Sequence, residues 1–255
     1  MRVAIVIPAR FASSRLPGKP LLRDTGKYLI QHVWEQASKA KCAADVIVAT
    51  DDDRIFAAVR AFGGRPVMTR EDHVSGTDRV AEVAAHLDAD VIVNVQGDEP
   101  QLDPADIDLL ANLMRAPGTD MATLAVPITS AENYLSPNVV KVVCDDRGQA
   151  LYFSRSPIPM VRDGEPDFAA RPARFLQHLG VYAYRRDFLL RIAGAPPHPL
   201  EESEKLEQLR VLGTSGTIAV GTVARAHRGI DTPADYAEFV RWCREGGGDG
   251  TRRAA

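Results

Sequence analysis

Residues 91–100 read VIVNVQGDEP, a nearly all-apolar run that ends in two adjacent carboxylates. A strand without polar alternation is typical of a sheet whose two faces are both covered. Residues 46–49, VIVA, have the same character. We therefore expect both strands to be central in a sheet with helices on each side.

The N-terminal half alternates such strands with helical periodicity. Strands are predicted at residues 3–7, 46–49, 66–68, 91–95 and 121–126, and helices at 28–40, 52–62, 77–87 and 104–114. Repeated βαβ units give a mainly parallel sheet, because each helix returns the chain to the edge where the next strand begins. The sequence therefore predicts an α/β fold.

The pattern changes beyond Asn138. The runs 139–144 and 150–153 are separated by turn residues and predict an antiparallel hairpin, and residues 157–172 lack apolar periodicity and predict a long loop. Strands at 179–184 and 217–222 and helices at 187–193, 200–212 and 233–244 follow. We expect one domain over residues 1–245, with an insertion at about 138–200, and a disordered tail at 246–255.

Composition excludes several classes of protein. With 255 residues and 45% hydrophobic content the chain can bury a large core, and its net charge of −3 gives no overall attraction to nucleic acid or to an anionic membrane. The three cysteines are far apart and lack C-x-x-C spacing, so neither a disulfide framework nor a zinc site is indicated. Because Pro8 ends the early apolar run, no signal-peptide core or membrane span is indicated, and we expect a cytoplasmic protein.

A cationic loop follows the first strand. Residues 8–20 read PARFASSRLPGKP and place Arg10, Arg15 and Lys19 among small residues and prolines. Such a loop suits a polyphosphate, because backbone N–H groups can approach the phosphates while the cations neutralise departing pyrophosphate. It is not a P-loop, since its only glycine is Gly18 and no Gly-Lys-Ser/Thr occurs. A solvated basic loop is the alternative.

Two carboxylates from distant segments predict a metal site. Asp98 follows the buried strand at 91–95, where a carboxylate can hold Mg²⁺ together with phosphate oxygens. Asp231 precedes a helix that begins with Pro233. The alternatives are that Asp98 shapes a turn and that Asp231 or Thr232 caps the helix.

Residues 73–79, HVSGTDR, open a helix and present free N–H groups and hydroxyls. This arrangement suits the edge of a nucleotide base, although capping by Ser75 or Thr77 is the use that the sequence alone favours. Residues 51–53 are likewise interpreted as the start of a helix.

Taken together, these segments resemble the CMP-Kdo synthetases, which act on 3-deoxy-manno-octulosonate (Kdo). The resemblance runs in order from about Val3 to Phe239 and rests on PARFASSRLPGKP, HVSGTDR, VNVQGDEP, NVVKVV, YFSRSPIP, HLGVYAY, LEQLRVL and IDTPADY. It implies a Rossmann-like nucleotidyltransferase fold and a homodimer, with the insertion forming the sugar and dimer contacts. It also implies Mg²⁺-dependent coupling of CTP to the anomeric hydroxyl of Kdo, for lipopolysaccharide or related glycan synthesis.

The resemblance also assigns site residues. Those assigned to the nucleotide are Pro8, Ala9, Arg10, Ser13, Arg15, Lys19, Ser75, Gly76, Arg79 and Gln96. Those assigned to Mg²⁺ are Asp98 and Asp231, and those assigned to the sugar are Arg155, His178, Tyr182, Glu207 and Gln208. Arg10, Arg15, Lys19 and Asp98 are the expected catalytic residues. On the sugar side, Arg155 and His178 would meet the acid and Glu207 and Gln208 the hydroxyls.

Other functions stay open at this point. A CMP-sialic acid synthetase has the same chemistry, and residues 163–173 and 201–205 leave an amino-substituted Kdo open as the sugar. A metal-dependent glycosyltransferase usually has a D-x-D motif after a strand, which Gly97-Asp98-Glu99-Pro100 replaces here. A catalytically silent nucleotide-binding subunit would be expected to have lost some of these charged residues.

Overall fold

The computed structural model describes residues 1–12, 15–226 and 229–247. In this part of the chain the strands are β1 (Val3–Ala9), β2 (Ala43–Thr50), β3 (Arg65–Met68), β4 (Val91–Asn94), β5 (Met121–Pro127), β6 (Lys141–Cys144), β7 (Ala150–Ser154), β8 (Leu176–Arg185) and β9 (Ile218–Thr222). The helices are α1 (Leu29–Ala37), α2 (Asp53–Ala61), α3 (Gly76–Ala84), α4 (Pro104–Leu113), α5 (Ala131–Leu135), α6 (Arg186–Ala193), α7 (Pro199–Glu204), α8 (Gln208–Gly213) and α9 (Pro233–Arg244), with a 3-10 turn η1 (Lys19–Leu21).

The described strands form one mixed sheet in the order β3-β2-β1-β4-β8-β5-β9. All of these strands run in one direction except β8, which is antiparallel to both β4 and β5. The predicted α/β fold with a mainly parallel sheet is therefore confirmed. Of the two strands expected to be central, β4 is the middle one, whereas β2 lies next to the edge strand β3 and its first half is partly exposed.

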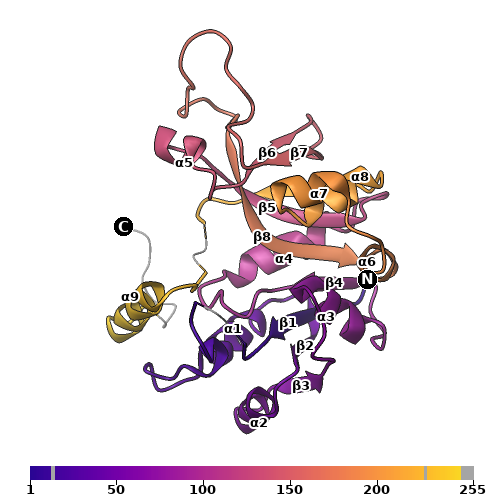
Figure 1. Cartoon of the computed structure of the whole chain (residues 1–255), viewed down its shortest axis with the longest axis vertical. Coiled ribbons are helices and arrows are strands. Elements are labelled where there is room, and N and C mark those ends of the chain that lie inside the picture. Colours follow the sequence, from indigo (N-terminus) through magenta and orange to yellow (C-terminus); the bar gives the residue numbers. More distant parts are fainter. Residues whose placement is uncertain (13–14, 227–228, 248–255) are drawn as a thin grey trace.

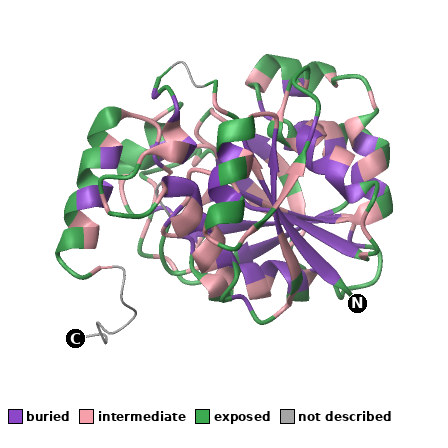
Figure 2. Cartoon of the chain, turned by 90° about the horizontal axis from the view of Figure 1, so that it is seen from below, coloured by how far each residue is buried: buried purple, intermediate pink, exposed green. Residues whose placement is uncertain are grey.

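The sheet is sandwiched between helices because successive side chains of a strand point to opposite faces. On β1, Val3, Ile5 and Ile7 join the core formed with α1, α2 and α4, whereas Ala4 and Val6 join the core formed with α3, α6 and α8. Figure 2 shows the buried strands between helices whose outer sides are exposed. Because both faces are covered, any ligand must approach the ends of the strands.

The expected antiparallel insertion is the hairpin of β6 and β7, and β6 also pairs with β8. The hairpin and the long loop that follows it stand at the end of the molecule opposite α2 and β3 (Figure 1). This loop contains no helix or strand between Ser154 and Leu176. Its Phe168 packs with Tyr134 and Phe175 in a small aromatic cluster.

One predicted helix is wrong. Residues 200–212 form two helices, α7 and α8, because Lys205 adopts a left-handed conformation with φ 54° and ψ 49° and ends α7. Two elements, α5 and η1, were not predicted. Residues 248–255 of the expected tail lie outside the described residues. No described helix has the length and apolarity that crossing a membrane requires.

Candidate active site

The loops after β1 and β4 meet at the carboxyl ends of these parallel strands. A Cβ atom at Gly97 would lie 2.6 Å from the carbonyl oxygen of Pro8, so only glycine allows this approach. At Gly76, the first residue of α3, a Cβ atom would lie 3.5 Å from the Pro8 ring and 3.9 Å from Gln96 Oε1. Ala9, at the end of β1, is buried. Backbone from three segments thus forms one continuous surface.

Lys19 joins this surface to the segment before α9. Its Nζ donates to Asp98 Oδ2 at 2.6 Å and to the Ile230 carbonyl at 2.8 Å, and it lies 3.4 Å from Asp231 Oδ1. Arg15 donates to the same Asp231 oxygen at 3.0 Å. Two carboxylates that are far apart in the sequence therefore meet at one ammonium group.

Local structure explains why Lys19 reaches this point. Gly18, in a left-handed conformation, precedes η1 and donates its N–H to the Phe11 carbonyl at 3.3 Å, which closes the loop. The guanidinium of Arg54 lies 3.4 Å from the centre of the Phe11 ring, which supports the loop from α2. Arg10, which follows β1 directly, is exposed, and Ser13 lies outside the described residues.

The contacts of the two aspartates bear on their alternative roles, which are turn shaping for Asp98 and helix capping for Asp231. Thr232 is the N-cap of α9, and it forms a capping box with Asp235, so the Asp231 carboxylate is not needed as a cap. The Asp98 carboxylate contacts Lys19 instead of backbone in its own turn. Both carboxylates are thus directed at the cation and are available to a ligand.

The donor set around Lys19 fits Mg²⁺. Two carboxylates and a backbone carbonyl converge on a cation, and hard oxygen ligands of this kind, completed by phosphate oxygens, are what Mg²⁺ prefers. Burial and the neighbouring Asp98 charge raise the pKa of Glu99 to about 8. In the described residues no group of three or more His, Cys, Asp or Glu side chains could hold a metal alone, so the substrate would have to complete the ligand set.

A cavity of about 360 Å³ opens beside this edge of the sheet. That volume is in the range of small-molecule sites. It is lined by Gly76, Thr77, Gln96, Asn138, Val139, Val140, Gln177, His178, Gly180, Tyr182, Lys205, Leu206, Glu207 and Gln208.

A chain of buried polar side chains forms one wall of this cavity. The Thr123 hydroxyl donates to the carbonyl oxygen of Leu179 or Val181. The Thr123 Oγ1 therefore accepts from His178 Nε2 at 3.0 Å. This network assigns the ring proton to Nε2 and leaves Nδ1 as an acceptor, 3.5 Å from the amide nitrogen of Gln208. Burial lowers the pKa of His178 to about 3, so the ring is neutral at ordinary pH.

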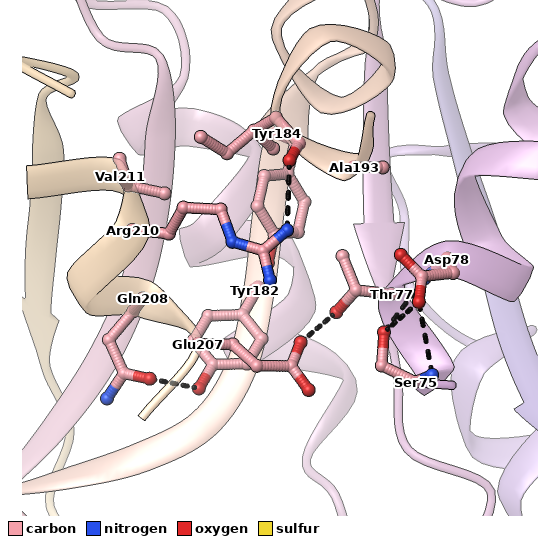
Figure 3. A pocket seen from close by; sticks show the side chains of 11 residues that line it. Ser75, Thr77, Asp78, Tyr182, Tyr184, Ala193, Glu207, Gln208, Arg210 and Val211 are labelled. Atoms are coloured by element: carbon pink, nitrogen blue, oxygen red, sulfur yellow. Dashed lines mark hydrogen bonds between the residues drawn. The ribbon is translucent and has the colours of Figure 1, made fainter. Parts of the chain in front are cut away.

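Opposite this chain, Thr77 at the start of α3 and Glu207 before α8 line the cavity, and Figure 3 shows them in the adjoining pocket, which shares both residues. Ser75 accepts from the Asp78 N–H at 3.1 Å in a capping box, which confirms the capping interpretation. Thr77 donates to Glu207 Oε2 at 2.8 Å and so connects α3 to the segment that enters α8.

Comparisons with known proteins show the family of this chain. A family model described as cytidylyltransferase matches residues 4–218. The chain is 52% identical to the 3-deoxy-manno-octulosonate cytidylyltransferase of Geobacter sulfurreducens, with 94% of this chain and 98% of that protein covered. The protein of the same name from Escherichia coli is 50% identical, with 91% and 92% covered. The chain belongs to the 3-deoxy-manno-octulosonate cytidylyltransferase family.

Solved structures agree with this membership. The CMP:2-keto-3-deoxy-manno-octonic acid synthetase complexed with CTP has a TM-score of 0.90 and 47% identity, with 96% of this chain and 100% of that chain covered. The 4-diphosphocytidyl-2C-methyl-D-erythritol synthase of Anaerococcus prevotii, at 14% identity and a TM-score of 0.63, shares the fold alone. The fold that the resemblance implied is therefore confirmed.

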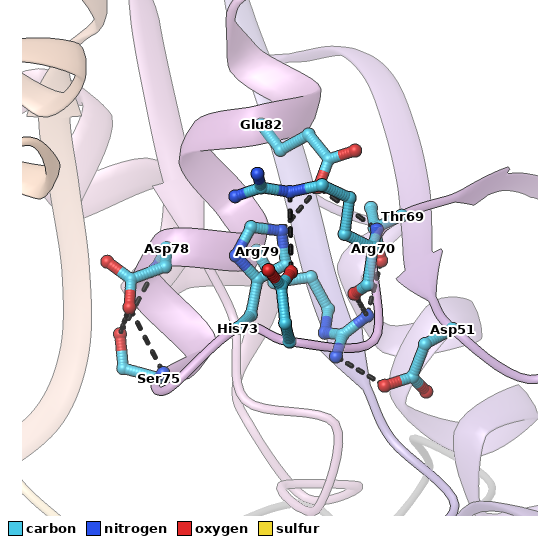
Figure 4. Close-up of polar contacts among 9 residues, drawn as sticks. Asp51, Thr69, Arg70, His73, Ser75, Asp78, Arg79 and Glu82 are labelled. Atoms are coloured by element: carbon cyan, nitrogen blue, oxygen red, sulfur yellow. Dashed lines mark hydrogen bonds and ion pairs between the residues drawn. The ribbon is translucent and has the colours of Figure 1, made fainter.

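Two arginines assigned to ligands lie elsewhere in this cytidylyltransferase. Arg79 is 3% exposed, and its guanidinium contacts Asp51 at 2.5 Å, the Thr69 hydroxyl and the Arg70 carbonyl (Figure 4). These contacts give Arg79 a structural role, because a buried cation needs this many partners. It ties α3 to the segments after β2 and β3.

Arg155 is the second. Its Nε donates to the Glu204 carbonyl at 2.8 Å and its Nη1 to the Pro137 carbonyl at 3.1 Å. It is not among the residues that line the cavity, so the structure does not bring it to the wall formed by His178, Tyr182 and Gln208.

Sequence reasoning missed three polar residues of the cytidylyltransferase cavity, Asn138, Gln177 and Lys205. Asn138 lies inside the NVVKVV segment that supports the resemblance, and this signal could have found it. Lys205 was counted as one charged position of a single helix. Only its left-handed backbone distinguishes it.

Proposed function

We propose that this chain transfers CMP from CTP to the anomeric hydroxyl of Kdo and releases pyrophosphate. The observation that carries the proposal is the convergence of Asp98 and Asp231 on Lys19 next to a cavity of about 360 Å³ with a polar wall. The cationic loop suits the phosphates, and the cavity suits a polyhydroxylated acid. The names of the relatives supply the particular nucleotide and sugar.

In this proposal each charged group has a separate task. The anomeric oxygen attacks the α-phosphorus of CTP, the bond to the β-phosphate oxygen breaks, and the hydroxyl proton passes to water. Lys19, Arg10 and Arg15 neutralise the charge that develops on pyrophosphate. Mg²⁺ held by Asp98 and Asp231 would polarise the α-phosphate and lower the pKa of the attacking hydroxyl.

The sugar is oriented by neutral hydrogen-bonding groups and one carboxylate. Tyr182 OH lies 3.5 Å from Gln208 Oε1, so both side chains are held in place by the chain that starts at Thr123. Glu207 is held by Thr77 and can accept from a sugar hydroxyl. Because His178 is neutral and donates its Nε2 proton to Thr123, it can only accept from a sugar hydroxyl at Nδ1, and it does not form an ion pair with the acid.

We also propose a cytoplasmic homodimer whose product enters lipopolysaccharide or related glycan synthesis. Two apolar side chains of the insertion support an interface there, since Leu151 is 62% and Met160 is 80% exposed. Sedimentation equilibrium should give twice the chain mass, and a monomer at micromolar concentration would contradict the dimer.

Pyrophosphate release tests the reaction directly. The purified chain is mixed with each of the four nucleoside triphosphates, with and without Kdo and with and without Mg²⁺. We expect release only when CTP, Kdo and Mg²⁺ are all present. Release with sialic acid in place of Kdo would favour the sialic acid synthetase, and release without Mg²⁺ would remove the metal from the proposal.

A further inference from the structure

Lys205 stands at an unusual place in the backbone. It ends α7 in a left-handed conformation, and its N–H bonds the Glu201 carbonyl. Side chains other than glycine rarely adopt this conformation, so an observed case is a reason to look for a function. Lys205 is exposed and lines the cavity that also contains His178 and Gln208. Its ammonium makes no hydrogen bond or ion pair with any residue in the described part of the chain.

A sugar acid in this cavity would need a cationic partner. Among the described lining residues, Glu207 is the one carboxyl group, and burial raises its pKa; Lys205 is the one lining cation, since His178 is held neutral. A sugar acid would bring a second carboxylate into the same space as Glu207. Without an opposing cation the two like charges would repel each other, and the substrate would lose affinity.

Arg155 supports Lys205 from behind the cavity wall. Its guanidinium joins the carbonyl oxygens of Glu204 and Pro137, which directly precede the lining residues Lys205 and Asn138. The Glu204 carboxylate accepts in turn from the Ser154 hydroxyl at 2.6 Å and the Arg155 N–H at 3.0 Å. One side chain therefore fixes the backbone next to two lining residues that are far apart in the sequence.

We propose that Lys205 is the residue that binds the carboxylate of the sugar substrate, and that Arg155 is a positioning residue that acts through the backbone of Glu204. This inference rests on the proposed function. It gives the acid of Kdo a partner that neither Arg155 nor His178 supplies in this structure. It also accounts for the break between α7 and α8, because a continuous helix would not place residue 205 at the wall of the cavity.

The test compares Kdo with its methyl ester, which lacks the negative charge, in Lys205→Gln, Lys205→Gly and Lys205→Arg. A charge-assisted hydrogen bond has a value of about 10- to 100-fold in binding. We expect Lys205→Gln and Lys205→Gly to raise KM for Kdo by about that factor, to leave KM for CTP within about twofold, and to lose the preference for Kdo over the ester. Lys205→Arg should retain most of the preference.

The matched control is Lys39→Gln, which removes an exposed lysine just beyond α1 and should leave both KM values unchanged. Near-normal KM for Kdo in Lys205→Gln would overturn the proposal. A normal Lys205→Gly protein would do the same, because glycine keeps the backbone and lacks the ammonium. If the wild-type chain released no pyrophosphate from CTP and Kdo, the proposed function itself would fail, which is a different outcome from a selective loss in the variants.

Discussion

At the scale of single residues, the sequence pointed to the two aspartates of the site. It did not predict the partners of Arg79 or the protonation state of His178. The position of Asp98 after a buried strand pointed to the ligand edge of an α/β sheet, whereas Asp231, which precedes a helix, was paired with it only by the family resemblance. The role of Arg79 was not, because an arginine at a helix start looks the same whether it faces a ligand or Asp51. The neutrality of His178 depends on burial, which the sequence does not show.

The first residue-scale prediction concerns Asp98. Asp98→Asn keeps the volume of the side chain and removes the charge that faces Lys19. We expect turnover to fall by about two to three orders of magnitude, because the group acts on charge that develops in the transition state. The melting temperature should stay near that of the wild type, since Lys19 keeps the Ile230 carbonyl and Asp231 as partners. Steady-state kinetics and thermal melts check this, and normal turnover would return Asp98 to a turn-shaping role.

The second residue-scale prediction concerns His178 and pH. Its pKa is about 3 in the folded chain against 6.5 for an ordinary histidine, so the unfolded chain binds more protons between these values. The free energy of unfolding must therefore fall as pH is lowered below about 6.5, by up to about 1.4 kcal/mol per pH unit from this residue.

Urea titrations between pH 7.5 and 4.5 measure this dependence. We expect His178→Gln to be less stable than the wild type at pH 7.5 but to lose less stability on acidification. Parallel profiles for the two proteins would contradict the neutral assignment. The solvent-exposed His86 offers the matched control, and His86→Gln should leave the slope unchanged.

At the scale of elements, hydrophobic patterning located the strands and helices of the βαβ units well, because each buries a full face. It failed where one residue redirects the chain. Lys205 divides a helix that its charged neighbours made appear continuous. The antiparallel insertion of β8 between β4 and β5 could not be predicted either, because a buried strand has the same pattern in both directions.

The element-scale prediction concerns the contact between the end of β1 and the loop after β4. Gly97→Ala would place a methyl group 2.6 Å from the carbonyl oxygen of Pro8 in β1, so the strand end or the loop must move. We expect a loss of about 1–3 kcal/mol in the free energy of unfolding and a rise in KM for CTP of at least tenfold. At Gly194, after α6, a Cβ atom would make only an ordinary contact at 3.7 Å. Gly194→Ala should therefore change neither quantity, and equal effects of the two variants would remove the special role of Gly97.

At the scale of the whole molecule, the last helix of the described chain packs beside the first loop, at the candidate active site. The final helix α9 returns to the first loop, where Phe239 and the preceding Ile230 share a cluster with Leu16 of the loop and Leu29 of α1. The Tyr236 hydroxyl accepts from the Asp24 N–H at 2.9 Å, which fixes the same contact. The sequence pattern predicted the bounds of α9. It did not predict this long-range contact, which depends on tertiary packing that periodicity does not encode. The cationic loop therefore depends on the last element of the described chain.

The whole-molecule prediction follows from this closure. Phe239 is 4% exposed and contacts the His32 ring edge-on at 5.1 Å between centroids. Phe239→Ala should lower the free energy of unfolding by about 3–5 kcal/mol and, well below its melting temperature, raise KM for CTP, because the loop that carries Arg15 and Lys19 loses its support.

A matched control separates the general loss of stability from the effect on the loop. Phe62 packs on Trp34 at 5.5 Å between centroids, in the core on one face of the sheet and apart from the α9 cluster. Phe62→Ala should also lower the melting temperature, yet leave KM for CTP unchanged, because its ring packs on Trp34 of α1 and not in the cluster that joins α9 to Leu16. If both variants raise KM equally, α9 has no particular role in holding the loop. A rise confined to Phe239→Ala means that nucleotide affinity depends on docking of the final helix.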